Sequence, residues 1–307
     1  MIQELPAEVM VREVGPRDGL QAEDRWVDTA DKIKLIDLLS KSGLKRIEAT
    51  SFVHPKAIPQ LRDAAETMGG IERAPGVRYE AIVPNVKGAE RAVEAGMDGI
   101  GIFISATETH NRSNVRMSVA ESLKHIRGIV ETAAAAEIAV KGSVVVAFGC
   151  PYEGDVSSEQ IFRVIRGYRE LDIRDILLGD TTGMANPAQV HRTVRAILEE
   201  FPEVSLTLHF HDTRGTGLAN VLAGMEAGVL SYDASVGGLG GCPYAPGATG
   251  NIATEDLVYM LEEMGVRTGV DLDALLDCAR FAATLVDHDL PGHVLKAGKR
   301  TRPAPRP

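Results

Sequence analysis

Short apolar runs rich in β-branched residues alternate along this chain with longer stretches in which apolar residues recur every three or four positions. A short apolar run bounded by glycine, proline or polar residues is typical of a buried strand, and the longer period is typical of an amphipathic helix. Eight runs predict strands, at residues 9–14, 46–50, 79–83, 99–104, 143–148, 175–178, 205–210 and 232–236. Helical patterns follow at residues 28–39, 88–94, 119–136, 157–171, 187–201, 216–227 and 253–264.

This alternation predicts eight βα units with parallel strands. Such units close most simply into a (β/α)8 TIM barrel of the α/β class, and a doubly wound open sheet is the structural alternative. A further helical pattern at residues 271–285 predicts an additional C-terminal helix outside the barrel. We expect one barrel domain over residues 1–295, because no linker separates a second one. Residues 296–307 contain five Lys or Arg and three Pro, so we expect a basic, loosely ordered tail.

A glycine-rich segment follows the eighth predicted strand. Residues 237–251 include six glycines and two prolines, a composition that forbids a regular helix or strand. Because active sites of this barrel class lie at the C-terminal ends of the strands, we interpret the segment as a lid over a site. The segment contains Cys242, for which three roles are considered: an inert small residue, a nucleophile or a general acid. An unperturbed thiol has a pKa of about 8.5 and is mostly protonated at neutral pH, which favours the general acid.

Polar side chains gather at the predicted C-terminal ends of strands 1, 7 and 8. His209 and His211 are two residues apart on strand 7, so both side chains point to the same face. Asp18 follows strand 1 and Asn251 follows strand 8, and these two strands are neighbours in a closed barrel. A carboxylate, two imidazoles and an amide oxygen favour Mg²⁺ or Mn²⁺, with zinc as an alternative. Without a metal, the alternatives are two hydrogen-bonded histidines and an asparagine that caps the following helix.

Charged and polar residues also lie at the ends of strands 1, 2 and 6. Arg17, beside Asp18, is either a surface ion pair or a cation aimed at negative charge that develops during a reaction. Glu48 and Asp180 lie within strands, where a carboxylate must be paired, and we expect Arg17 and the metal site to be their partners. Ser51 follows strand 2 at the same rim.

Three further features are less specific. The segment at residues 110–116 is polar and basic, so Asn111 and Arg112 are candidates to meet an anionic substrate or cofactor tail, although a solvated loop has the same composition. Cys150 follows strand 5 and is either near the site or a packed thiol. Cys278 lies on the apolar face of the last helix, and we expect it in the core. Neither a G-x-G-x-x-G nor a P-loop motif is present, so dinucleotide and P-loop sites are excluded.

The amino-acid composition limits the kinds of molecule that the protein is expected to bind and the cellular compartment in which we expect it. The 33 Lys and Arg against 43 Asp and Glu give a formal charge of −10, which argues against nucleic acid and anionic membranes as partners. The cysteines are widely separated and odd in number, so a disulfide framework is excluded and a reducing compartment is expected. The N-terminal residues resemble no signal or transit peptide, and no apolar run approaches the roughly 20 residues that span a bilayer. We therefore expect a cytoplasmic protein.

Several motifs together resemble the 3-hydroxy-3-methylglutaryl-CoA lyase family, within the wider group of metal-dependent acyl-CoA lyases and Claisen-condensing synthases that share one barrel. The matching segments are residues 11–21 (VREVGPRDGLQ), 48–53 (EATSFV), 148–154 (FGCPYEG), 209–213 (HFHDT) and 237–261, which begins with the glycine-rich segment. The resemblance extends from Val11 to His288. It implies a TIM barrel, a homo-oligomer that is most simply a dimer, an acyl-CoA thioester substrate and a need for Mg²⁺ or Mn²⁺.

The resemblance also assigns roles, because every site position of the family holds a matching residue here. The metal ligands fall on Asp18, His209, His211 and Asn251. The arginine that stabilises an enolate falls on Arg17, the loop cysteine falls on Cys242, and the supporting acids fall on Glu48, Asp180 and Glu255. We place Ser51, Asn111 and Arg112 near the substrate.

The implied reaction is the retro-Claisen cleavage of 3-hydroxy-3-methylglutaryl-CoA to acetyl-CoA and acetoacetate, as in leucine and ketone-body catabolism. Two departures concern the substrate: Ala57 stands where family members commonly have tryptophan, and residues 180–187 read DTTGMANP in place of DTIGVGTP. A sister lyase for a bulkier branched 3-hydroxyacyl-CoA is therefore the first alternative. A condensing synthase is a second, although we expect such an enzyme to carry a long C-terminal extension. A catalytically silent barrel that serves as a binding protein is the alternative from another class.

Overall fold

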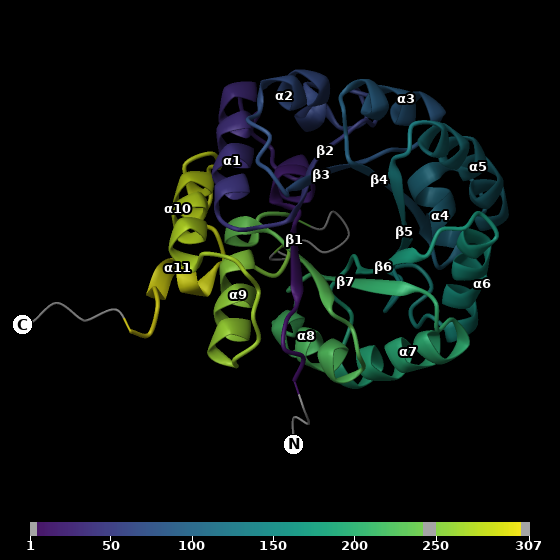
Figure 1. Ribbon diagram of the computed structural model, residues 1–307. Helices are drawn as coiled ribbons and strands as arrows, with labels where there is room; N and C mark the ends of the chain where they lie inside the picture. Colours follow the sequence, from purple (N-terminus) through teal and green to yellow (C-terminus); the bar gives the residue numbers. More distant parts are fainter. Residues whose placement is uncertain (1–4, 242–249, 302–307) are drawn as a thin grey trace, which may run out of the picture.

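The polypeptide forms a closed barrel of eight parallel strands (Figure 1). The computed structural model describes residues 5–241 and 250–301. The strands follow the chain order around the barrel, and the first pairs with the last to close it. Their bounds are β1 (Met10–Glu13), β2 (Arg46–Ser51), β3 (Arg78–Ile82), β4 (Gly99–Ser105), β5 (Ala139–Val145), β6 (Asp175–Asp180), β7 (Ser205–Phe210) and β8 (Ser231–Ala234). The predicted (β/α)8 fold is confirmed, and the alternative of an open sheet is wrong.

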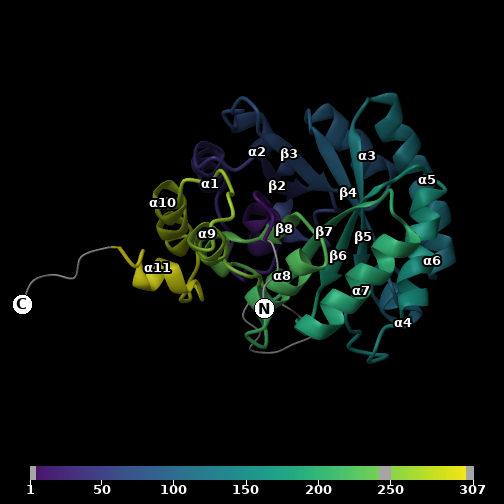
Figure 2. The ribbon, with the colours of Figure 1, turned by 60° about the horizontal axis from the view of Figure 1, so that its bottom comes forward.

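Helices surround the barrel in both views (Figure 1 and Figure 2). Those of the βα units are α1 (Thr29–Lys41), α2 (Ala64–Gly70), α3 (Val86–Glu94), α4 (Glu108–Val115), α5 (Val119–Ala135), α6 (Ser158–Arg169), α7 (Pro187–Glu200), α8 (Gly217–Glu226) and α9 (Thr254–Glu263). Two more, α10 (Leu272–Ala283) and α11 (His293–Ala297), pack beside α9, and α10 also contacts α1. The predicted C-terminal helix is confirmed. Among the described helices, none combines the length with the apolarity needed to span a bilayer.

Helix α6 shows how the sequence pattern builds the outer layer. A capping box closes its N-terminus: the Ser157 hydroxyl accepts from the Gln160 amide, and the Gln160 side chain accepts from the Ser157 amide. Four residues at helical spacing are buried, namely Ile161, Val164, Ile165 and Tyr168. The Tyr168 hydroxyl donates to the Ser143 carbonyl on β5 (2.8 Å), so the helix is fixed to the strand beneath it.

Several elements differ from the sequence prediction, and three of them have a clear physical reason. Strand β5 ends before residues 146–148, because Val146 has a φ of 54° that takes it out of the extended ladder. The polar segment considered as a solvated loop forms α4, which ends at Val115 and is followed by Arg116 with a left-handed φ of 60°. Helix α2 has no counterpart among the predicted ranges, because its short sequence ends in two glycines and carries little helical period.

The interior of the barrel holds charged side chains, where branched apolar residues are the usual filling. We call seven of them the interior charge network: Arg12, Arg46, Glu48, Glu80, Lys141, Asp175 and Asp233. Arg12 is the most connected member, since it pairs with Glu48, Glu80 and Asp233. A buried charge is costly unless it is paired, so each member of the network depends on its direct partners.

The chain after α10 returns to the barrel surface. Lys299 pairs with Asp273 of α10 (Nζ–Oδ2 2.6 Å), and Arg300 pairs with Glu263 of α9. The first residues of the predicted tail therefore lie against these two helices. Residues 302–307 lie outside the described residues.

Candidate active site

A cavity of about 300 Å³ opens at the C-terminal ends of the strands. Its polar side includes Arg17, Asp18, Gln21, Glu48, His209, His211 and Asp233. Its apolar side includes Val53, Ile58, Ile82, Phe103, Val145 and Leu177. The sequence predicts a site at this rim, because parallel barrel strands present their carboxyl ends on one face.

Asp18, His209 and His211 form a cluster that is able to hold a metal ion. Asp18 lies in the single helical turn η1 (Gly15–Gly19), where its amide donates to the Val14 carbonyl (2.7 Å). The rings of the two histidines have centroids 5.1 Å apart. Each Nε2 lies 3.9 Å from Asp18 Oδ2, and the candidate ligand atoms of the three residues lie within 4.8 Å of one another. The predicted convergence of both histidines on one face is confirmed.

The protonation states of Asp18 and His211 fit a divalent metal ion. Burial opposes the ionisation of Asp18, but the charge of Arg17, supported by the neighbouring histidines and the hydrogen bond from Asn251, holds its pKa well below its ordinary range. Burial and the neighbouring His209 lower the pKa of His211 to about 4, so this imidazole is neutral at pH 7. An ionised carboxylate and a neutral imidazole are the forms that bind metal ions. Burial lowers the pKa of His209, but the hydrogen bond with Asp233 and the charge of Asp18 raise it above its ordinary value, so metal binding there must displace a proton.

Asn251 reaches the cluster from the end of the glycine-rich segment. Its Nδ2 donates to Asp18 Oδ2 (2.8 Å) and to the Leu239 carbonyl (3.1 Å), and its backbone forms a bridge with His211. Ala253 occupies the N-cap of α9, so the interpretation of Asn251 as the helix cap is wrong. A half-turn of the amide group exchanges its two ends and brings Oδ1 to face Asp18.

Arg17 lies between Asp18 and Glu48. Its Nη1 donates to Asp18 Oδ1 (2.5 Å), and its Nε and Nη2 contact Glu48 Oε1. The Glu48 side chain is 2% exposed, whereas the Arg17 side chain is 14% exposed and lines the cavity. The predicted pairing of Glu48 with Arg17 is confirmed, and it gives the guanidinium group a fixed orientation at the cavity wall.

Asp180 has a different environment from the predicted one. Its Oδ1 accepts from the amides of Met184 (2.8 Å) and Ala185 (3.1 Å). The chain neighbours Gly179 and Thr181 line the cavity, whereas the Asp180 side chain is fully buried and its pKa is raised by burial to about 6. The expectation that the site arginine pairs with this carboxyl group is wrong, because the group holds the turn after β6.

Glu255 lies behind the glycine-rich segment. Its Oε2 accepts from the Gly237 amide (2.9 Å) at the start of the segment, in the short turn η3 (Val236–Gly238). Within the described part of the chain, Oε1 has no hydrogen-bond partner. Burial raises the pKa of Glu255 to about 8. Glu255 therefore supports the base of the segment rather than the wall of the cavity.

Glu13, the last residue of β1, links this strand to the turns η1 and η3 and to the start of α9. Its Oε1 accepts from the amides of Gly15 (2.7 Å) and Val236 (2.9 Å), and its Oε2 accepts from the Thr254 hydroxyl (2.7 Å). Burial raises its pKa to about 7. Glu13 is not among the residues predicted to act at the site, although a carboxylate at the end of a buried strand must find donors.

Helix α4 brings His110 and Asn114 to the cavity. Asn111 is turned away, because its Oδ1 accepts from the Ser105 amide (3.0 Å) and its Nδ2 donates to the Ser122 hydroxyl (2.8 Å). The structure therefore assigns Asn111 to the support of α4, in contrast to the predicted contact with substrate.

Ser51 and Arg112, the other two residues that the sequence places near the substrate, differ in position. Ser51 lines the cavity, and its hydroxyl accepts from the Val53 amide (3.3 Å). Arg112 is exposed on α4 and does not line the cavity formed by the described residues.

The three cysteines have separate environments. Cys150 is buried, and its sulfur accepts from the Thr107 hydroxyl (3.1 Å), so it is a packed thiol. Cys278 lies in the core as predicted, and burial raises its pKa to about 12. Cys242 lies outside the described residues, whereas its neighbour Gly241 lines the cavity.

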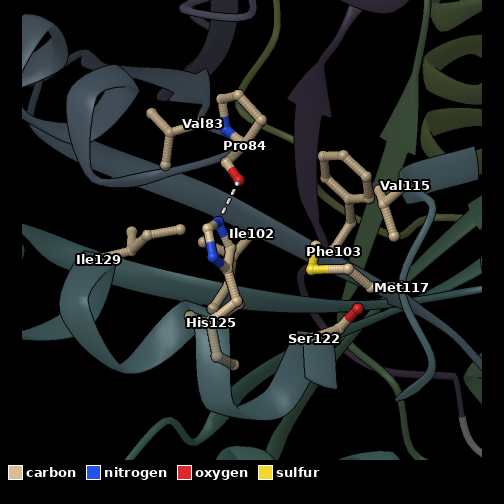
Figure 3. A pocket seen from close by; sticks show the side chains of 10 residues that line it. Val83, Pro84, Ile102, Phe103, Val115, Met117, Ser122, His125 and Ile129 are labelled. Atoms are coloured by element: carbon tan, nitrogen blue, oxygen red, sulfur yellow. Dashed lines mark hydrogen bonds between the residues drawn. The ribbon is translucent and has the colours of Figure 1, made fainter. Parts of the chain in front are cut away.

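A second, small pocket has a volume of about 20 Å³ (Figure 3). Apolar side chains form most of its wall, and His125 Nε2 lies 3.3 Å from the Pro84 carbonyl at one side. Phe103 contributes to the lining of both this pocket and the cavity. The pocket has room for about one water molecule. Its volume is therefore too small for any part of a substrate while the Phe103 side chain keeps this position.

Three buried charged residues near the site, Arg12, Glu80 and Asp233, are not among those predicted from the sequence. Asp233 Oδ2 lies 3.2 Å from His209 Nδ1 and 3.0 Å from Arg12 Nη1. A signal for these residues exists, since charged residues in the middle of buried strands must pair. Their pairing is hidden in the sequence, because Arg12 is 68 positions from Glu80 and 221 from Asp233.

The chain is similar to hydroxymethylglutaryl-CoA lyases both in sequence and in structure. The HMGL-like family model matches residues 8–282. Hydroxymethylglutaryl-CoA lyase YngG of Bacillus subtilis is 49% identical over 294 residues, which cover 96% of this chain and 98% of that protein. Human mitochondrial hydroxymethylglutaryl-CoA lyase is 45% identical over 293 residues, which cover 95% of this chain and 90% of that protein. The structure of an HMG-CoA lyase from Acinetobacter baumannii in complex with coenzyme A and 3-methylmalate matches with a TM-score of 0.93 at 50% identity, over 98% of both chains.

Proposed function

Since the chain belongs to the HMGL-like family, we propose that it cleaves 3-hydroxy-3-methylglutaryl-CoA to acetyl-CoA and acetoacetate with the aid of a divalent metal ion. The protein is a carbon–carbon lyase of the hydroxymethylglutaryl-CoA lyase type, as are the relatives that match nearly its full length. The observation that carries the proposal is the cluster of Asp18, His209 and His211 beside Arg17 at the mouth of the barrel.

The proposed metal ligands are Asp18, His209, His211 and, through Oδ1 after a half-turn of its amide, Asn251. Mg²⁺ or Mn²⁺ is the proposed ion, because oxygen and imidazole donors without a thiolate favour these ions over softer ones. When bound, the ion supplies Lewis-acid chemistry that polarises oxygen atoms of the substrate. Asp233 orients His209 by accepting from Nδ1, which leaves Nε2 to face the cluster.

The reaction breaks the bond between C2 and C3 of the acyl group. A base removes the 3-hydroxyl proton, the hydroxyl oxygen becomes the ketone of acetoacetate, and the electron pair of the broken bond passes to C2 as a thioester enolate. The proposed base is a water molecule beside the cluster, because both histidines are assigned to the ion, and Asp180 uses one carboxylate oxygen to bind two backbone amides and does not line the cavity. Arg17 is the proposed cation for the enolate oxygen, since Glu48 and Asp18 hold its guanidinium group at the cavity wall.

Cys242 is the proposed acid that protonates C2 of the enolate and so completes acetyl-CoA. A thiol with an ordinary pKa carries its proton at neutral pH, as this role requires. Its neighbour Gly241 lines the cavity. Glu255 is proposed to support the segment that bears the cysteine, through its hydrogen bond with the Gly237 amide.

The apolar side of the cavity is the proposed site of the methyl-bearing acyl group. Ile82, Phe103, Val145 and Leu177 offer it carbon surface, and Ser51 offers one hydroxyl. A volume of about 300 Å³ lies at the lower end of the range usual for small-molecule sites. This size fits a short acyl group better than a bulkier one, with the coenzyme A portion toward the open mouth.

We also propose that the protein is a homo-oligomer, most simply a dimer, in the cytoplasm. Two of its cysteines, Cys150 and Cys278, are free and buried, as a reducing compartment allows. Size-exclusion chromatography with light scattering tests the dimer, and a particle of monomer mass at all concentrations would contradict it. Cell fractionation tests the compartment.

A coupled assay for acetyl-CoA release tests the proposed reaction. The metal-loaded protein should release acetyl-CoA and acetoacetate in equal amounts, and faster than it cleaves thioesters with a bulkier group at C3. EDTA should abolish the release, and added Mg²⁺ or Mn²⁺ should restore it. Cys242→Ser should lose most of the turnover and keep its metal affinity. Failure of a metal-binding preparation to cleave any branched 3-hydroxyacyl-CoA would overturn the proposal.

A further inference from the structure

Arg12 lies at the centre of the interior charge network and contacts three carboxylates. Its Nε donates to Glu80 Oε2 (2.6 Å), its Nη1 donates to Asp233 Oδ2 (3.0 Å), and its Nη2 contacts Glu48 Oε2. The side chain is 1% exposed and does not line the cavity formed by the described residues. We propose that Arg12 is a positioning residue that fixes Arg17 through Glu48 and fixes His209 through Asp233.

The first path runs through Glu48. Its Oε2 contacts Arg12 and its Oε1 contacts Arg17, so the two oxygens of one carboxylate join two guanidinium groups. A buried carboxylate is stable only when its oxygens are paired, and both cations are needed to hold Glu48 in one rotamer. Without Arg12, Oε2 loses its partner and Glu48 is free to turn. Arg17 then loses the contact that orients it toward the cavity.

The second path runs through Asp233. Arg12 and Asp233 are register partners in the pairing of β1 with β8, which places the carboxylate beside the guanidinium group. The same oxygen, Oδ2, accepts from Arg12 Nη1 (3.0 Å) and lies 3.2 Å from His209 Nδ1. An acceptor at Nδ1 selects the tautomer with a proton on that nitrogen and leaves the Nε2 lone pair toward Asp18. Arg12 therefore holds in place the group that orients a proposed metal ligand.

The two paths close into a ring, because Arg17 also pairs with Asp18 and Asp18 faces both histidines. The order around the ring is Arg17, Glu48, Arg12, Asp233, His209 and Asp18. The remaining contact of Arg12 leads away from the site, since Glu80 continues to Arg46 (Nε–Oε1 2.7 Å). A planar guanidinium group serves carboxylates in three directions, which the single ammonium group of lysine cannot do at the same distances.

Mn²⁺ binding tests this role independently of the substrate, whereas the effect on turnover rests on the proposed function. Arg12→Met should bind Mn²⁺ about tenfold more weakly in an EPR titration of the free ion, the low end of the loss usual when a group that orients a metal ligand is removed. At saturating Mn²⁺, kcat should fall by at least about tenfold while KM changes little, because a misplaced Arg17 weakens only the transition state. Circular dichroism establishes that the variant is folded.

Arg12→Lys keeps the charge and provides the test if Arg12→Met does not fold. It should show the same two losses at smaller size, because lysine cannot hold Glu48 and Asp233 together. Arg46→Gln is the matched control, since it removes an arginine from the same network at the end that leads away from the site. Its Mn²⁺ affinity and kcat should stay within about twofold of the unmodified protein.

A double-mutant cycle with Asp233→Asn separates a positioning role from general destabilisation. If Arg12 acts on the metal site through Asp233, Arg12→Met should add little to the loss of Mn²⁺ affinity already caused by Asp233→Asn. Additive losses would overturn the proposal, as would a folded Arg12 variant with Mn²⁺ affinity and kcat within about twofold of the unmodified protein. If the unmodified protein does not cleave the thioester, the proposed reaction fails, and the Mn²⁺ titrations and the cycle still decide the role of Arg12.

Discussion

Glu255→Gln removes a titrating group from the interior and keeps its shape. Glu255 is fully buried, and burial raises its pKa from 4.5 to about 8. At neutral pH the folded protein holds this proton, whereas the unfolded chain has released it. Between pH 4.5 and about 8 the folded state therefore binds more protons than the unfolded state. The contribution of Glu255 to stability is fully present below pH 4.5 and is lost as the pH rises through about 8.

The two pKa values set the size of the effect. At about 1.36 kcal/mol per pKa unit, linkage gives a loss of roughly 2.5 kcal/mol from the free energy of unfolding between pH 5 and pH 7. Glutamine does not ionise, so the variant should lack this loss, and its side-chain oxygen can still accept from the Gly237 amide. Glu13, with its pKa raised to about 7, contributes a slope of the same sign in both proteins.

Urea unfolding at pH 5, 6 and 7 measures the effect. EDTA is present throughout, because metal binding would add a pH dependence of its own. The free energy of unfolding of Glu255→Gln minus that of the unmodified protein should rise by roughly 2.5 kcal/mol from pH 5 to pH 7. Glu226→Gln is the matched control for the chemical change, since Glu226 is exposed at the end of α8. A difference that stays constant over this range would mean that Glu255 is ionised in the folded protein, and the reasoning from burial would be refuted.

Three further predictions concern the site. Arg17→Gln should lower kcat by about 100- to 1,000-fold with little change in Mn²⁺ affinity, and a variant with near-normal turnover would remove its role at the enolate. His211→Ala should weaken Mn²⁺ binding by more than about 100-fold in an EPR titration, since loss of a ligand exceeds loss of a group that orients one. Phe103→Ala should widen the cavity and raise kcat/KM for a thioester with one more methylene at C3 by about tenfold relative to the normal substrate; an unchanged ratio in competition assays would show that Phe103 does not limit the acyl site.

Much of the barrel could be predicted from local pattern, because strands and helices leave different periods in the sequence. The β7 prediction at residues 205–210 coincides with the observed strand, and α5 and α7 differ from their predicted ranges by one residue. The failures occur where local pattern is weak or is overruled. Val146 has the side chain of a strand residue, yet its left-handed backbone ends β5 early. Helix α4 is polar almost throughout, so its sequence carries no apolar period.

Some residues of the candidate site could likewise be predicted from the sequence, and others could not. Asp18, His209 and His211 could be found because each follows or ends a predicted strand, and the barrel brings strand ends together. The orientation of a side chain at a strand end is decided by the nearest donors. Asp180 turns toward backbone amides that the sequence does not reveal as its partners. The pairs made by Arg12 depend on which strands become neighbours when the barrel closes, so local pattern could not identify them.

The position of the metal cluster couples ion binding to the closure of the barrel. Asp18 follows β1, whereas His209 and His211 come from β7, and Asn251, which is 233 positions from Asp18, follows β8. An ion that binds all four residues therefore binds only after β1 has paired with β8. At 100 times its Kd, such an ion stabilises the closed barrel by about 2.7 kcal/mol relative to any form in which that pairing is open. The time course of Mn²⁺ binding during refolding therefore reports when β1 pairs with β8.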